Sequence, residues 1–407
     1  MGSLPLITRI FSPENFGYYA FFVTIVSVLG MFTTGFYQSV IMITDSDRER
    51  RGIMFLILIL SLVVGLFFTG SIFFLGQISW APANIKLLGS HPVVLLFSLI
   101  LYGWCQTLYP WVNRQGYFTF MGAANVLRDS VLALGKLGFG YLGVLKFGLV
   151  YGYLGSQLVF FAMLLGPVVR NVRSELNASE ITLDKLYALA KKYVRFPKIF
   201  LATNFLQAFS LQAPIIFFGM LFGWKILGFY ALARSVAGLP IAILAGAIAA
   251  VFQREASQQY NKSGDCSVLF LKTGSTIFLS LIFPCLVAIA YTEPLFALAF
   301  GDQWVVAGTY CAILGPLYLI RLIGKPLSFV FQLTDHLELD FSLTLIFLMS
   351  SCLSLGIGYV FASAELSVYL ISISHSFSYL VYIYFGYQIS QGKQYSKIGK
   401  YIGKQLR

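Results

Sequence analysis

The sequence predicts an all-α integral membrane protein built from two six-helix lobes. Of its 407 residues 58% are hydrophobic and only 11% are charged, far outside the range of soluble globular domains. The apolar runs are also long and nearly continuous, whereas a spanning helix needs about 20 apolar residues and a barrel strand about 10. Because lipid admits only helices or closed barrels, these runs are expected to be transmembrane helices.

The apolar runs predict eleven complete spans. They cover residues 17–43, 53–75, 92–112, 118–143, 148–169, 197–222, 226–252, 268–291, 306–332, 341–362 and 366–389. The opening "MGSLPLIT" is too short to span a bilayer, and we interpret it as the end of a truncated first helix. The predicted organisation is an N-terminal helical lobe at 1–169, a cytoplasmic linker at 170–196, a C-terminal helical lobe at 197–390 and a basic cytoplasmic tail at 391–407.

Two polar segments are expected to form amphipathic helices on the cytoplasmic membrane surface. In the linker, "TLDKLYALAKKY" places Leu183, Leu186 and Leu189 at helical spacing, with Thr182 as the N-cap. In the tail, "QYSKIGKYIGKQLR" alternates apolar residues with lysines, as a helix among lipid headgroups does.

The basic residues predict the orientation. Most of the 28 lysines and arginines fall in loops on one side of the predicted spans, and basic loops stay in the cytoplasm. The C-terminus is therefore expected to be cytoplasmic. The net charge of +12 is then explained by topology and by contact with membrane lipids, and no nucleic-acid partner is expected.

A short internal repeat predicts that the two lobes are copies. Gly17 to Ala20 and Gly228 to Ala231 read Gly-Tyr-Tyr-Ala and Gly-Phe-Tyr-Ala, 211 residues apart. Each stretch opens the second helix of its lobe, so the repeat is expected to be parallel and pseudo-twofold. Two such lobes facing a central cleft are typical of transporters.

Five basic residues lie inside the predicted spans: Arg128, Lys136, Arg234, Arg321 and Lys325. A charge at bilayer depth costs at least about 2.5–3.5 kcal/mol, and Asp129 is the single acid available to pair with them. We therefore expect Arg234, Arg321, Arg128 and Lys325 to line an anion-accepting cavity. Arginine in particular binds two phosphate oxygens with its planar fork.

The alternatives differ by residue. Arg128 and Asp129 would also fit a structural ion pair, and Asp129 a coupling role. Lys136 is expected to extend its ammonium to the membrane interface.

Catalytic motifs are missing from the sequence. Three histidines and five cysteines show no metal-ligand, triad or CxxC spacing, and no phosphate-binding loop is present. We therefore expect neither an enzyme nor a metal or cofactor.

The chain resembles a known family in three runs: "RIFSPENFGYYAFF", "YVRFPKIFLATNFLQAFSLQAPIIFFGMLFGWKILGFYALARSVAGLPIAIL" and "LFALAFGDQWVVAGTYCAILGPLYLIRLIGKPLS". They are similar to the polysaccharide (O-antigen, Wzx-type) flippases, which belong to the multidrug/oligosaccharidyl-lipid/polysaccharide exporter superfamily. The resemblance implies a MATE-like fold in the bacterial inner membrane. It also implies movement of undecaprenyl-pyrophosphate-linked oligosaccharide to the outer leaflet, for O-antigen, capsule or exopolysaccharide synthesis.

The resemblance further implies that Arg234 and Arg321, with Arg128 and Lys325, neutralise the pyrophosphate. Other polysaccharide-assembly membrane proteins are further partners to be expected. Two alternatives remain open: a MATE-like drug/cation antiporter, which would need acidic residues in the cleft, and a membrane-bound polysaccharide polymerase.

Overall fold

The structure, a computed structural model, describes residues 2–79, 82–173, 182–334 and 336–392. Within these ranges the regular elements are helices and none is a strand, which confirms the predicted all-α class. The chain divides into two compact units, unit 1 (Met1–Gln212) and unit 2 (Ala213–Arg407). This boundary falls inside a helix, and the lobe and linker limits expected from the sequence stay a prediction.

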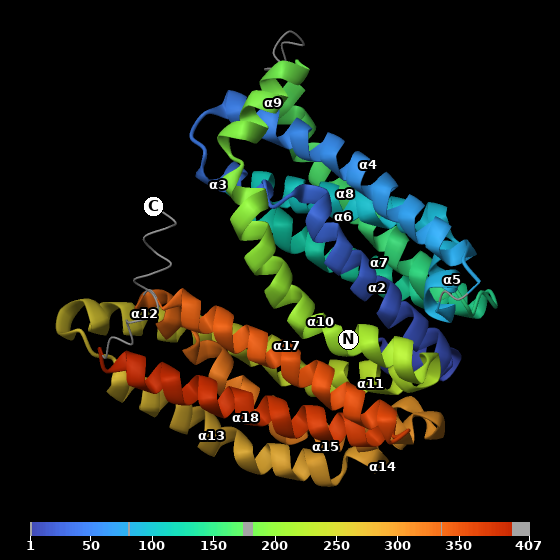
Figure 1. Ribbon diagram of the computed structural model, residues 1–407, viewed down its shortest axis with the longest axis vertical. Helices are drawn as coiled ribbons and strands as arrows, with labels where there is room; N and C mark the ends of the chain where they lie inside the picture. Colours follow the sequence, from blue (N-terminus) through green and yellow to red (C-terminus); the bar gives the residue numbers. More distant parts are fainter. Residues whose placement is uncertain (1, 80–81, 174–181, 335, 393–407) are drawn as a thin grey trace. The chain divides into compact units, whose positions relative to one another are not determined.

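Unit 1 is a bundle of long helices with short helices between them. In chain order its elements are α1 (Leu4–Ile10), α2 (Pro13–Thr34), α3 (Gln38–Ile43), α4 (Asp47–Gln77), α5 (Ala83–Gly89), α6 (Pro92–Arg114), α7 (Phe118–Tyr141), α8 (Gly148–Arg173), α9 (Leu183–Lys192), the π-helical turn η2 (Phe196–Phe200) and the start of α10 (Leu201–Phe222). Helix α6 is central, because it packs against α2, α4 and α8, and α7 packs along α8 (Figure 1).

Unit 2 is likewise a bundle of long helices with short helices between them. Its elements are the end of α10, α11 (Trp224–Ala237), the π-helical turn η3 (Ile241–Ala245), α12 (Gly246–Ser263), α13 (Ser267–Ala290), α14 (Thr292–Phe300), the 3₁₀ turn η4 (Asp302–Trp304), α15 (Val305–Leu327), α16 (Phe329–Leu333), α17 (Leu337–Val360) and α18 (Ala364–Ser390). Here α15 is central, packing against α11, α13, α14 and α18, while α17 packs along α18 (Figure 1).

The predicted internal repeat recurs in the helices. Helix α2 begins at Pro13 and α11 at Trp224, while α5 ends at Gly89 and α14 at Phe300, and each pair is 211 residues apart. Most packing pairs also correspond when α2, α4, α5, α6, α7 and α8 of unit 1 are matched in order with α11, α13, α14, α15, α17 and α18 of unit 2, although the packing of α2 on α4 has no comparable counterpart between α11 and α13. The two units therefore repeat one helical arrangement.

Serine side chains fix where several helices begin. The hydroxyl of Ser12 accepts a hydrogen bond from the backbone N–H of Asn15 at 3.4 Å, and that of Ser46 from Glu49 at 3.4 Å. Ser363 does the same for Leu366 at 3.1 Å. Each serine satisfies an N–H that the helix itself leaves unpaired.

The predicted span 17–43 is broken, and expecting one continuous helix there was wrong. It consists of α2 and α3, separated at Gly35 and Phe36, whose φ angles are 55° and 61°. Glycine adopts this left-handed conformation easily, whereas a side chain disfavours it. Helix α2 therefore ends at Thr34, with Gly35 as its left-handed C-cap.

The predicted span 226–252 is also divided. Helix α11 ends at Ala237, and the π-helical turn η3 follows Pro240 before α12 begins at Gly246. Proline has no N–H to donate to the preceding turn, and π-bulges form where the regular hydrogen-bond ladder is disturbed. The proline thus explains why a continuously apolar run does not form one helix.

Nine of the described helices are long and apolar enough to cross a membrane. The other two predicted spans are α7, which carries Arg128, Asp129 and Lys136, and the divided segment 226–252. Helices in the set of nine expose large apolar side chains, such as Phe67 and Phe74 on α4 at 67% and 71%. Such surfaces are suited to lipid rather than to water, and the chain is a multi-pass membrane protein.

Helix α9 lies where the sequence predicts the amphipathic linker helix, and it is attached to α4 of unit 1, while its place on the cytoplasmic membrane surface stays a prediction. The Glu49 carboxylate on α4 accepts hydrogen bonds from Lys192 Nζ at 2.6 Å and Tyr193 Oη at 2.8 Å. Tyr37 Oη donates to the Ala190 carbonyl at 3.1 Å. The hydrogen bond to Glu49 raises the pKa of the Lys192 ammonium above its ordinary value, because it favours the charged form. The predicted tail helix lies outside the described residues.

Candidate functional site

Two predicted site residues, Arg234 and Arg321, come together in unit 2. Arg234 lies on α11 and Arg321 on α15, two helices that pack directly against each other. Tyr230, His375 and Tyr379 each interact electrostatically with both arginines. Residues far apart in the sequence therefore form one positively charged cluster, which we call the arginine pair.

Neither arginine is fully satisfied. Arg234 Nη1 and Arg321 Nε are buried and lack a hydrogen-bond partner among the described residues. The contact recorded for the Arg321 guanidinium is the Tyr318 ring, whose centroid lies 5.7 Å from Cζ. A cation–π contact contributes about 0.5–2 kcal/mol, and it leaves the buried Nε–H of Arg321 without a hydrogen-bond acceptor, which costs about 1–3 kcal/mol. An arrangement of this kind favours the binding of an anion.

Lys325 lies one turn beyond Arg321 on α15 and is exposed. It interacts electrostatically with Arg321, and no carboxylate contact is recorded for it among the residues that the structure describes. The structure thus places Lys325 beside the arginine pair, at a more accessible position.

Hydroxyl groups of α17 and α18 lie around His375, which interacts with both arginines, and the sequence did not single them out. Ser351 Oγ is 2.8 Å from His375 Nε2, and Ser354 Oγ is 3.3 Å from Ser374 Oγ. His375 is only 7% exposed. A lone histidine and scattered serines show no motif along the chain. A signal was nevertheless available in "SSCLS" and "SISHSFS", whose polar residues recur at helical spacing inside apolar spans.

Arg128 and Asp129 lie in unit 1 and form an ion pair. Arg128 Nη2 is 3.0 Å from Asp129 Oδ1, and the Arg128 guanidinium also lies over the Phe160 ring at 4.8 Å. The structural alternative considered from the sequence is therefore present. A role of Arg128 in anion binding and of Asp129 in coupling stays a prediction.

Lys136 does not reach outward, so that expectation was wrong. The residue is 7% exposed, and Nζ lies 4.0 Å from the centroid of the Tyr19 ring on α2. Gly152 on α8 explains the geometry, because a Cβ atom there would come within 2.8 Å of the Lys136 backbone nitrogen and 3.1 Å of its Cγ. The close approach of α7 and α8 holds the lysine stem inside the bundle.

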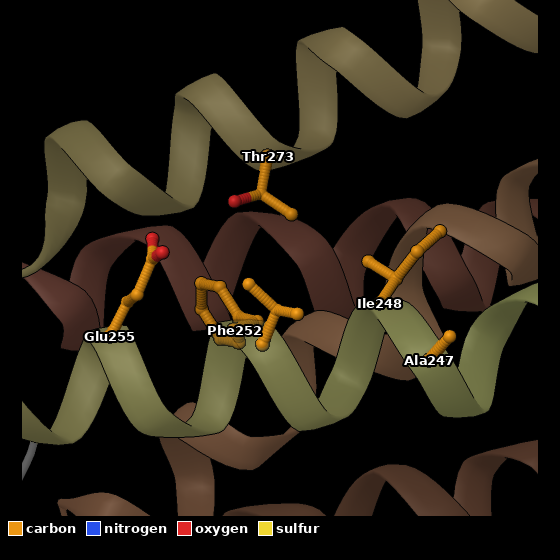
Figure 2. Close-up of a pocket in the computed structure, with 6 residues that line it drawn as sticks. Ala247, Ile248, Phe252, Glu255 and Thr273 are labelled. Carbon is orange, nitrogen blue, oxygen red and sulfur yellow. The ribbon is translucent and has the colours of Figure 1, made fainter.

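A separate groove lies between α12 and α13 of unit 2 (Figure 2). It has a volume of about 330 Å³, and its lining residues are Ala247, Ile248, Val251, Phe252, Glu255 and Thr273. None of the predicted site residues lines it. Among the described residues, no group of three histidine, cysteine, aspartate or glutamate side chains is arranged to hold a metal ion.

Residues 6–308 match the family described as polysaccharide biosynthesis protein. The chain belongs to this family. It is also 25% identical over 337 residues to the succinoglycan biosynthesis transport protein ExoT of Rhizobium meliloti (strain 1021). That alignment covers 80% of this chain and 63% of the relative, so the chain spans less than two thirds of the length of ExoT.

Solved structures share the fold of this polysaccharide biosynthesis protein. The lipid II flippase MurJ in an inward closed conformation has a TM-score of 0.71 at 12% identity, covering 96% of this chain and 87% of MurJ. An inward-facing MATE family multidrug resistance transporter of the MOP superfamily has a TM-score of 0.70 at 17% identity, covering 96% and 95%. The MATE-like fold is thereby confirmed. These relatives are transporters and flippases, in agreement with the expectation that the chain is not an enzyme.

Proposed function

We propose that this protein moves an undecaprenyl-pyrophosphate-linked oligosaccharide from the cytoplasmic to the outer leaflet of the bacterial inner membrane. The observation that carries the proposal is the arginine pair: two half-buried arginines, each with one buried N–H donor that lacks a hydrogen-bond partner among the described residues. Membership of the polysaccharide biosynthesis family supports a saccharide cargo. Alternating access, with a cytoplasmic C-terminus, is the mechanism we propose for it.

The chemistry of such a cargo fits the arginine pair. A pyrophosphate bonded to a lipid at one end and to a sugar at the other keeps two negative charges on closely spaced oxygens. Two guanidinium groups can neutralise these charges and donate several N–H bonds to the same oxygens. Arg234 Nη1 and Arg321 Nε, which lack partners in the described structure, would gain them on binding. A sugar that follows the pyrophosphate would reach the hydroxyl of Ser351, which is hydrogen-bonded to His375, a residue that interacts with both arginines.

A drug/cation antiporter is the second candidate from the sequence, and the surroundings of the arginine pair do not favour it. A binding site for cations needs acidic groups, whereas the groups recorded as interacting with these arginines in the described residues are tyrosines, His375 and Lys325. A polymerase would instead make product from purified protein without a second component, which the experiment below can also detect.

The test is complementation of a strain lacking the chromosomal copy. Lipid-linked repeat units should accumulate on the cytoplasmic side and surface polysaccharide should disappear. Wild type should restore export, while Arg234→Ala and Arg321→Ala should lower it about 10- to 100-fold, the factor expected for losing hydrogen bonds to a charged group. Arg254→Ala, at an exposed position on α12, is the matched control and should export normally.

Equal amounts of each variant in the membrane must accompany this comparison. Export that is unchanged in both arginine variants would contradict the proposal. Normal surface polysaccharide in the deletion strain, combined with altered tolerance of cationic drugs, would favour the antiporter.

A further inference from the structure

The groove between α12 and α13 changes in polarity from one end to the other. Ala247, Ile248, Val251 and Phe252 form an apolar wall along α12, and Glu255 closes one end of it (Figure 2). Eight residues separate Ala247 from Glu255, which corresponds to about 12 Å along a helix. Thr273 on α13 faces the same space from the other side.

Glu255 stands at the polar end without a partner. No hydrogen bond or ion pair of its carboxylate is recorded among the described residues, although basic residues surround it in the sequence. Arg254 precedes it, Lys262 ends the same helix, and Lys272 precedes Thr273 on the facing helix. Basic residues at one end of membrane helices mark the cytoplasmic headgroup region, so this carboxylate would lie at the level of lipid headgroups.

We propose that this groove binds an aminophospholipid, with phosphatidylethanolamine as the occupant. Its primary ammonium would donate charge-assisted hydrogen bonds to Glu255 and to the Thr273 hydroxyl. One acyl chain would lie along Ala247, Ile248 and Val251, where burial of apolar surface contributes about 25 cal/mol per Å². The lipid phosphate would lie among the positive charges of Arg254 and Lys272, which occupy the same levels of their helices as Glu255 and Thr273.

The arrangement of charges selects this lipid among membrane components. A purely anionic lipid would bring its negative charge against Glu255, which is unfavourable. Phosphatidylcholine has the same net charge as phosphatidylethanolamine, but its quaternary ammonium has no N–H to donate. The volume of about 330 Å³ falls within the range of small-molecule sites and accommodates a headgroup with the first part of one chain. The site is independent of the arginine pair and of the cargo proposed for it.

Lipid competition tests the proposal. The full-length protein is purified, exchanged into mixed micelles with equal amounts of phosphatidylethanolamine and phosphatidylcholine of distinguishable mass, and its bound lipids are measured by native mass spectrometry. Wild type should retain phosphatidylethanolamine over phosphatidylcholine by about three- to fivefold, because one exposed charge-assisted contact contributes at most about 1 kcal/mol. Glu255→Gln should reduce the preference to within about twofold.

Two further variants keep the result interpretable. Glu14→Gln removes an exposed carboxylate in the first turn of α2 and should leave the preference unchanged. Val251→Trp should fill the groove and lower retention of both lipids. Equal retention of the two lipids by wild type, or an unchanged preference in Glu255→Gln, would overturn the proposal.

Discussion

At the residue scale, we predict that the arginine pair lowers the free energy of unfolding of the protein. Replacing one member by an apolar side chain of similar length removes a half-buried charge with one buried N–H donor that has no hydrogen-bond partner among the described residues. Arg321→Met should therefore raise the melting temperature of the purified protein, by about 2–4 °C per kcal/mol gained, while it lowers export. Thermal unfolding in detergent, followed by circular dichroism, measures the change.

Arg254→Met is the control for this prediction, because Arg254 is exposed on α12, and its melting temperature should stay close to that of wild type. A clear fall in the melting temperature of Arg321→Met would contradict the prediction. It would mean that Arg321 supports the packing of α15 and that loss of export reports misfolding.

The sequence predicted which residues would be unusual but not what each one contacts. Cations inside apolar spans are conspicuous, and Arg234 and Arg321 lie on helices that pack against each other, while their role in lining an anion-accepting cavity stays a prediction. The burial of the Lys136 side chain depends on Gly152 of another helix, which lets α7 and α8 approach closely. The proximity of His375 and Ser351 likewise exists only once α17 packs on α18. Contacts between helices are not encoded in local spacing.

At the scale of elements, the attachment of α9 to α4 is predicted to depend on Glu49. This carboxylate accepts two hydrogen bonds from the end of α9, and Gly52, one turn further along α4, lies directly beneath Leu189. Glu49→Ala should increase hydrogen–deuterium exchange across residues 183–192 severalfold, because the contact that holds the helix end is lost.

Lys192→Gln and Lys191→Gln form a matched pair for this prediction. Lys192 donates to Glu49, whereas its neighbour Lys191 is exposed, with no contact recorded within the described chain. Faster exchange in the first variant and not in the second is expected. The same exchange rate in both would show that packing of Leu186 and Leu189 alone holds α9 in place.

Helix type and order could be predicted from the sequence, while helix breaks could not be placed. Apolar runs of sufficient length predict helices because lipid leaves no other solution. The runs 17–43 and 226–252 satisfy this criterion, yet Gly35 and Pro240 divide them. Glycine and proline also occur inside unbroken helices, as Pro110 does in α6. The presence of either residue type therefore does not by itself show where a helix breaks.

At the scale of the whole molecule, the repeat of 211 residues indicates that the two units arose from one arrangement of helices. The starts of α2 and α11 and the ends of α5 and α14 are each 211 residues apart, and most corresponding helices pack in corresponding pairs. The sequences of the two repeats match at only a few residues. A helix bundle constrains helix length and packing more than residue identity, so the arrangement is preserved although the sequences differ.

The last prediction concerns the direction of the two units in the membrane. A parallel repeat requires that corresponding loops face the same side. With the five native cysteines replaced by serine, single cysteines are introduced at four exposed positions: Gln115 and Lys146 in unit 1, and Lys262 and Lys225 in unit 2. A membrane-impermeant maleimide applied to intact cells should label positions 146 and 225, and positions 115 and 262 only after lysis. Labelling of 146 together with 262 would instead mean that the units are inverted. An inverted repeat would place the Glu255 groove at the outer leaflet, so this experiment also decides which leaflet supplies its lipid.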